Sequence, residues 1–267
     1  MKLIKLVYTL WIILLIPSIY ADENTQLSQT ENENENCIIP AYTEYHPIKS
    51  NNDIITFTKV KRQDTYNHGE EEIRVYRTNC NTEKGSAIAR LPYTISSSQA
   101  KIAEAFFYKD TLIILYQYPY SSKTVPYTSD QYRTYAYQKD KTIYFDDDKV
   151  HAFLSNGADI VESNGDGYVY PYKTKEAIIK GLSSNLYKRY NNNEQITGEI
   201  TKRTKLQPVN TYFAKTKIYV EKGMEFKVDK ISAGWLSIEY LDSNKKVLNK
   251  WVMCKDTSLC KENGEVL

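Results

Sequence analysis

The chain has 267 residues, with 35 Lys and Arg against 33 Asp and Glu, 24 tyrosines and four cysteines. This near balance of charge argues against a general nucleic-acid binder, which needs a basic surplus. The length allows two domains, and the recurring alternation of apolar and polar residues predicts a β-rich α+β protein.

The first 21 residues have the pattern of a secretory signal peptide. Lys2 and Lys5 precede the apolar run Leu6–Ile19, and Ala21 offers a small residue for cleavage. The alternative is a membrane anchor, but the run is shorter than the roughly 20 apolar residues that a spanning helix needs. We therefore expect a periplasmic or secreted protein without stable membrane insertion. Loss of Lys2 and Lys5 would lower the basic count from 35 to 33, equal to the acidic count of 33.

Residues 22–36 are rich in Asn, Glu, Gln, Ser and Thr and carry five acidic side chains without a basic one. So little apolar surface cannot offset the entropy of ordering, and this composition predicts a disordered acidic tail. A folded, tyrosine-rich domain is expected to follow over residues 37–192, then a linker over 193–200.

Four cysteines follow the predicted signal peptide: Cys37, Cys80, Cys254 and Cys260. An even number in an exported chain indicates two disulfides, and three pairings are formally possible. We predict Cys37–Cys80 and Cys254–Cys260, because the other pairings would tie the two predicted domains together. A zinc site is the alternative, but no Cys-x-x-Cys pair or nearby histidine supports it.

Alternating patterns predict the strands of the first domain, with helices between and after them. The predicted strands are 54–60 and 72–76, the hairpin 103–108 and 111–118, and the hairpin 132–138 and 142–145. A short helix is predicted over 99–103, a second over 147–155, and a third over 175–190 with Thr174 as its cap.

The sequence lacks a recognisable catalytic or metal-binding constellation. The histidines, His46, His68 and His151, do not form a two-histidine helical motif, and each cysteine has a predicted disulfide partner. The sequence of residues 162–167 matches the first half of a calcium-binding loop. Lys173 occupies the twelfth position, where such a loop has a carboxylate ligand, so a hairpin turn is favoured. We expect a non-enzymatic protein without a cofactor. A hydrolase using acids such as those at 70–72 is the less favoured alternative.

Tyrosines concentrate between residues 116 and 144. Tyrosine offers a large contact area and a polar hydroxyl, which suits binding surfaces, although strands also favour it. The Pro-punctuated segment 118–127 is the part least suited to burial. We therefore predict partner contacts at Tyr118, Tyr120 and Tyr127.

The C-terminal part, residues 201–262, carries the clearest strand pattern. Alternation over 224–228 and 236–240, a small-residue turn at 232–234 and a third strand over 247–252 predict a compact unit of short strands. Strands this short and this close favour a small barrel, which would remove exposed edges.

This stretch resembles the bacterial SH3-like domain over about residues 201–260. The resemblance rests on Lys222-Gly223, an alternating strand, Gly234-Trp235, an Ile-x-Tyr strand and a closing Trp251-Val252. It implies a small β-barrel that binds peptidoglycan peptides or docks onto proteins, with Trp235 and Trp251 as candidate contacts. Lys250 replaces the usual glycine before the last tryptophan, and residues 206–212 lack the usual Asn-x-Arg-x-Gly-Pro loop.

Two binding functions compete. The first is an inhibitor that binds a protein, most specifically an immunity protein against a secreted toxin that attacks the cell envelope. The second is a peptidoglycan-binding module that retains the protein at the wall. The tyrosine-rich domain and the altered first loop favour the protein partner. Residues 198–267 carry thirteen basic and nine acidic side chains, a surplus that we interpret as a solvated surface.

Overall fold

The computed structural model describes residues 43–50, 53–61, 71–79, 85–95, 98–119, 128–161, 167–212, 216–241, 246–261 and 263–267. These residues form antiparallel sheets and three α-helices. The predicted signal peptide, the acidic tail, Cys37, Cys80, Tyr120, Tyr127 and His68 lie outside the described residues. In the described part of the chain, no helix has the length and apolar character needed to cross a membrane.

The first sheet has the strand order β1-β2-β3-β4. Its strands are β1 (Ile48–Ser50), β2 (Asp53–Lys61), β3 (Glu71–Asn79) and β4 (Gly85–Pro92). Phe57 on β2 lies opposite Val75 on β3, and both side chains are completely buried. The predicted strands 54–60 and 72–76 are confirmed.

The central sheet has the order β12-β11-β9-β8-β7, with β10 paired to β9. Its strands are β7 (Lys101–Tyr108), β8 (Thr111–Tyr118), β9 (Thr128–Asp140), β10 (Ile143–Asp146), β11 (Asn156–Val161) and β12 (Gly167–Tyr168). Both predicted hairpins of this region are confirmed, β7 with β8 and β9 with β10.

The helix predicted over 99–103 is wrong. Gln99 belongs to the short pair β5 (Thr94–Ile95) and β6 (Ser98–Gln99), and β7 begins at Lys101. Ile102 lies opposite Tyr116 of β8 and is buried. Pairing with a fully buried neighbouring strand outweighs the weak helical preference of so short a segment.

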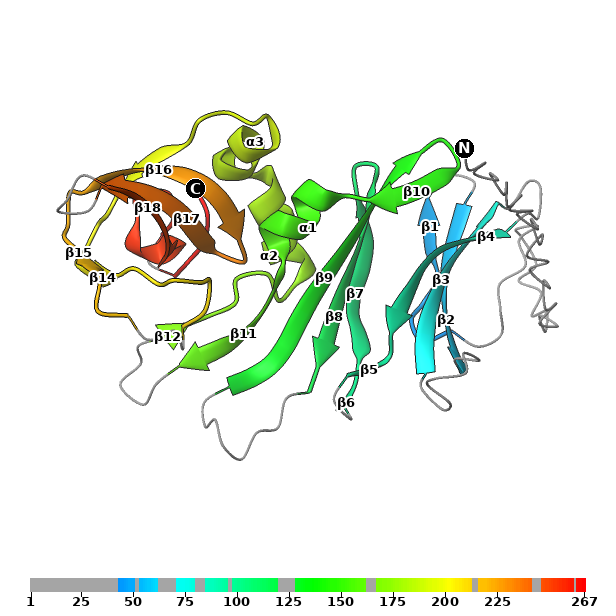
Figure 1. Cartoon of the computed structure of the whole chain (residues 1–267). Helices are drawn as coiled ribbons and strands as arrows, with labels where there is room; N and C mark the ends of the chain where they lie inside the picture. Colours follow the sequence, from blue (N-terminus) through cyan, green and yellow to red (C-terminus); the bar gives the residue numbers. More distant parts are fainter. Residues whose placement is uncertain are drawn as a thin grey trace, which may run out of the picture.

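The three helices lie on the side of the central sheet that faces away from the first sheet, and α1 and α2 pack against it at β9 and β7 (Figure 1). They are α1 (Asp148–Leu154), α2 (Lys175–Ser183) and α3 (Asn185–Asn191). The predicted helix 147–155 is confirmed: the Asp147 carboxylate accepts from the Val150 amide as the N-cap, and Phe153 is completely buried.

The single helix predicted over 175–190 is two helices. Thr174 caps α2 as predicted, with the Ala177 amide donating to its hydroxyl at 3.2 Å. Ser184 has an extended backbone conformation, which ends α2. Its hydroxyl accepts a hydrogen bond from the Tyr187 amide at 3.1 Å and so caps the start of α3. The apolar stripe nevertheless continues, and Ile178, Leu182 and Leu186 are all buried.

The C-terminal sheet has the order β13-β16-β17-β18, and β14 pairs separately with β15. The bounds are β13 (Thr197–Glu199), β14 (Thr204–Lys205), β15 (Tyr219–Val220), β16 (Glu225–Ser232), β17 (Trp235–Leu241) and β18 (Val247–Met253), followed by a short 3-10 helix (Cys254–Asp256). The three predicted strands are confirmed. A closed barrel stays a prediction.

The central sheet lies between two hydrophobic cores (Figure 1). On β8, Leu112, Ile114 and Tyr116 pack with the first sheet, whereas Ile113 and Leu115 pack on the opposite face. That second core includes the helices and continues into the C-terminal sheet. The alternation of side chains along a strand therefore explains why β8 is apolar on both faces.

Residues 193–200, predicted as a linker, are part of this second core. Ile196 is 3% exposed and Ile200 is completely buried, while β13 pairs with β16. Part of the segment therefore forms a strand, β13, and two of its isoleucines are buried. The division of the chain into two domains stays a prediction.

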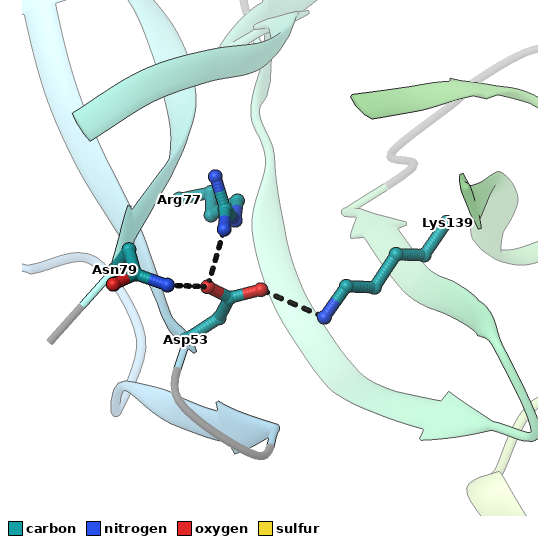
Figure 2. A network of polar contacts seen from close by, with 4 residues as sticks. All are labelled: Asp53, Arg77, Asn79 and Lys139. Carbon is teal, nitrogen blue, oxygen red and sulfur yellow. Dashed lines mark hydrogen bonds and ion pairs between the residues drawn. The ribbon is translucent and has the colours of Figure 1, made fainter. Parts of the chain in front are cut away.

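A polar network joins the first sheet to the central sheet. Asp53 on β2 is 3% exposed and lies between Arg77 of β3 and Lys139 of β9. Figure 2 shows that Oδ1 of Asp53 pairs with Arg77 and accepts a hydrogen bond from the Asn79 side-chain amide. Oδ2 of Asp53 accepts a hydrogen bond from Lys139.

Candidate functional site

A groove of about 640 Å³ opens beside the C-terminal sheet. Its walls come from β14, β15, the end of β18 and the 3-10 helix that follows. Five basic side chains line it, together with aromatic and small polar residues. The basic residues are Lys202, Arg203, Lys205, Lys217 and Lys255; the others include Thr204, Gln207, Tyr212, Tyr219, Trp235 and Asp256.

A buried carboxylate organises the base of this groove, which we call the basic groove. Asp256 is 2% exposed, and the Thr204 hydroxyl donates to its Oδ2 at 2.6 Å. Lys202 Nζ lies 2.9 Å from Oδ1, and the Thr201 amide donates to the Asp256 carbonyl. A buried charge is tolerated only when it is paired and hydrogen-bonded, so these contacts hold residues 201–204 against the 3-10 helix.

An exposed aromatic ring forms the rim. Tyr219 is 46% exposed and lies opposite Lys205 in the β14–β15 pair. The Arg203 guanidinium lies 4.8 Å from the centre of the Tyr219 ring and pairs with Glu221 at 3.0 Å. The Lys205 ammonium is 5.9 Å from the same ring. The ring thus orders two cations at the mouth of the groove.

The groove carries more positive charge than its own carboxylates neutralise. Lys255 Nζ donates to the Gly167 carbonyl at 2.6 Å, an uncharged partner. Among the described residues, Lys205 and Lys217 have no ion-pair partner. A concave surface lined by one sign of charge concentrates ligands of the opposite sign. The basic groove can therefore attract an anionic ligand.

A disulfide closes the loop beneath the groove. Cys254 and Cys260 are bonded, with their Cα atoms 5.4 Å apart, and both are buried. The predicted Cys254–Cys260 pairing is confirmed. The loop contains Asp256, so the bond limits the conformations that this carboxylate can adopt in the unfolded chain. The Cys37–Cys80 pairing lies outside the described residues.

The two tryptophans predicted as partner contacts differ in their exposure, and their contact with a partner stays a prediction. Trp235 borders it and is only 2% exposed, with its ring 5.5 Å from that of Tyr168. Trp251 is half-buried and exchanges two backbone hydrogen bonds with Gln207, of 2.7 and 2.8 Å. Trp235 therefore acts mainly in the core, because its indole fills the space between the C-terminal sheet and β12.

Tyr118 is also buried, at 6% exposure, with its ring against Tyr116. Burial raises the pKa of its hydroxyl. The ring packs between the first and central sheets, and the partner contact of Tyr118 stays a prediction. Tyr120 and Tyr127 lie outside the described residues.

The residues considered for catalysis occupy separate places. Glu71 lies 3.6 Å from Lys59, and Glu72 pairs with Arg74 at 2.8 Å, both on the first sheet. His46 stacks near Tyr45, and His151 lies on α1. Among the residues that the structure describes, no group of three or more His, Cys, Asp or Glu side chains is placed to hold a metal ion.

The basic groove was not among the sites predicted from the sequence. The available indication was the basic surplus in residues 198–267, which we interpreted as a solvated surface. Lys202, Lys205, Lys217 and Lys255 are spread along the chain, and only the fold brings them around one cavity.

Comparison of the chain with protein-family models, curated proteins and solved structures finds no match. The resemblance of residues 201–260 to the bacterial SH3-like domain therefore stays a prediction. The groove itself is the feature from which a function can be inferred.

Proposed function

We propose that the chain is an exported, non-enzymatic binding protein that engages a protein partner through the basic groove. The observation that carries this proposal is the pair of unneutralised lysines, Lys205 and Lys217, beside the exposed ring of Tyr219. The most specific role that we propose is that of an immunity protein against a toxin acting on the cell envelope.

A protein partner suits the chemical make-up of the groove. Tyrosine and arginine are enriched among the residues that dominate protein–protein affinity, and Arg203 and Tyr219 already contact each other at the rim. Their contact fixes two long side chains before a partner arrives, which reduces the entropy lost on binding. The groove also rests on a paired carboxylate and a disulfide, so its frame is preorganised.

The second candidate is a peptidoglycan-binding module that retains the protein at the wall. It is supported by the three C-terminal strands, which match the spacing of the SH3-like resemblance. Trp235, the central residue of that resemblance, borders the groove. Wall peptides carry carboxylates, which the same lysines would attract.

A pull-down from envelope extract tests the protein-binding proposal. The bait is the mature protein, compared with a Lys205→Glu/Lys217→Glu variant and with a Lys222→Glu/Lys230→Glu control. The control changes two exposed lysines of the C-terminal part that do not line the groove. We expect one partner, identified by mass spectrometry, to be captured by the wild type and the control and lost with the groove variant.

Sedimentation with purified sacculi decides between the two candidates. Cosedimentation that depends on Lys205 and Lys217, with no protein captured, would replace the protein-binding proposal by the wall-binding one. Release of soluble fragments from sacculi would overturn the non-enzymatic assignment. If a toxin is captured, inhibition of its activity by the wild type and not by the groove variant would support the immunity role.

A further inference from the structure

Some basic side chains of the basic groove already have an ion-pair or hydrogen-bond partner within the protein, and others are available to a ligand. Lys202 pairs with Asp256, Arg203 with Glu221, and Lys255 with the Gly167 carbonyl. Among the residues that the structure describes, the available charges are Lys205 and Lys217, both exposed. A ligand therefore meets two ammonium groups that can each accept a new anionic partner without breaking an existing ion pair.

These two lysines flank the exposed ring of Tyr219. Lys205 lies across the β14–β15 pair from Tyr219, and Lys217 precedes it by two residues. An extended polypeptide advances about 3.3 Å per residue and directs alternate side chains to one side. A carboxylate, an apolar or aromatic side chain and a second carboxylate at every second position (i, i+2 and i+4) can thus meet one lysine, the ring and the other lysine on the same face.

Phosphate-rich polymers fit this arrangement less well. Arginine is the residue whose planar fork matches phosphate, but Arg203 already contacts Tyr219 and Glu221. Polymers of phosphate also gain their affinity from many neutralised charges, whereas the described lining of the groove offers two free ammonium groups. The whole chain adds little general attraction, with 35 basic against 33 acidic residues.

We infer that the ligand of the basic groove is an acidic stretch of polypeptide containing an apolar or aromatic residue, bound by Lys205 and Lys217 on either side of Tyr219. This inference rests on the proposed function and specifies the chemistry of the partner's contacting segment. The affinity comes from two charge-assisted contacts and the ring, so it should fall steeply with salt.

Fluorescence anisotropy with defined probes tests this chemistry. The probe is a labelled peptide of about eight residues in which glutamate, tyrosine and glutamate occupy every second position, with serines between them, so that all three side chains share one face of the extended chain. A matched peptide has glutamine in place of each glutamate. We expect the acidic peptide to bind the full mature chain, with affinity reduced at least about tenfold by Lys205→Glu/Lys217→Glu. The Lys222→Glu/Lys230→Glu control should bind as the wild type does.

The competing outcomes are separable. Equal binding of the glutamine peptide, or equal binding by the groove variant, would overturn the inference. Binding of inorganic polyphosphate in place of the acidic peptide would also overturn it. The acidic peptide could fail to bind while the pull-down still captures a partner in a way that depends on Lys205 and Lys217. In that case the inferred chemistry of the ligand is wrong and the proposed function stands. Circular dichroism of the variants confirms that each one is folded.

Discussion

Lys139 of β9 forms an ion pair with Asp53 of β2, and the distance from Nζ to Oδ2 is 2.7 Å (Figure 2). The contact crosses from the central sheet to the first sheet, between residues far apart in the chain. Asp53 also forms an ion pair with Arg77, at 2.7 Å, so one buried carboxylate pairs with two basic side chains. Loss of this carboxylate would remove the ion-pair partner that both cations have among the described residues.

The first prediction concerns that carboxylate. Asp53→Asn should lower the free energy of unfolding by about 3–5 kcal/mol, because removal of one partner leaves buried charge uncompensated. Urea denaturation followed by tryptophan fluorescence measures the change. Lys101→Met, at an exposed position of β7, is the control and should stay within about 0.5 kcal/mol of the wild type. Equal stability of the two variants would show that the network contributes little.

The second prediction is a pH dependence of the same network. Burial opposes ionisation of Asp53, but the hydrogen bonds from Arg77 and Lys139 outweigh it and hold its pKa below the usual 3.8. A group whose folded pKa is lowered stabilises the protein above its unfolded pKa and loses that contribution as pH falls through the folded one. The stability difference between wild type and Asp53→Asn should therefore be full above about pH 4 and shrink below it. A difference that is constant down to about pH 2 would contradict this.

The third prediction concerns the junction between α2 and α3. The Ser184 hydroxyl donates to the Gly181 carbonyl at 2.7 Å and accepts from the Tyr187 amide at 3.1 Å. Ser184→Ala should cost about 1 kcal/mol of stability, the usual effect of losing an N-cap. Thermal unfolding compares it with Lys188→Ala, which changes an exposed position of α3. An unchanged melting temperature for Ser184→Ala would refute the capping role.

The fourth prediction concerns Glu265 near the C-terminus. Hydrogen bonds and charge from Lys180, on α2, and from Lys261 lower the pKa of its carboxyl to about 2. An NMR titration of the side-chain carboxyl carbon should show this low midpoint, and Lys180→Met should raise it. Titration of wild-type Glu265 near the ordinary value of 4.5 would mean that Lys180 does not hold the carboxylate in solution.

The fifth prediction concerns the disulfides. Digestion without reduction should release a closed loop joining Cys254 to Cys260 and a peptide pair joining Cys37 to Cys80. Replacing Cys254 and Cys260 by alanine should cost about 2 kcal/mol, the entropy of so short a loop. A free thiol at Cys37 or Cys80, measured by alkylation and mass spectrometry, would show that the second pairing is wrong.

Local pattern alone predicted the longer strands β2, β3, β7 to β10 and β16 to β18, and the starts of α1 and α2. Period-two alternation located β2, β3, β8 and β16 to β18, because a strand with one buried face must alternate, and a buried one reads as a continuous apolar run. The caps at Asp147 and Thr174 were also predictable, since a capping side chain acts within three residues of its own position. The Cys254–Cys260 bond was predicted because the other pairings would tie the two predicted domains together.

Only the tertiary structure decided which distant residues meet. Pairing with β8 makes residues 101–103 a strand, and packing against the C-terminal sheet draws Ile196 and Ile200 into a core. The same packing buries Trp235, which the sequence analysis named as a candidate partner contact. The basic groove depends on this long-range order most of all. Lys205, Lys217 and Lys255 belong to different segments, and no local period relates them, so their shared cavity exists only once β14, β15 and β18 are assembled.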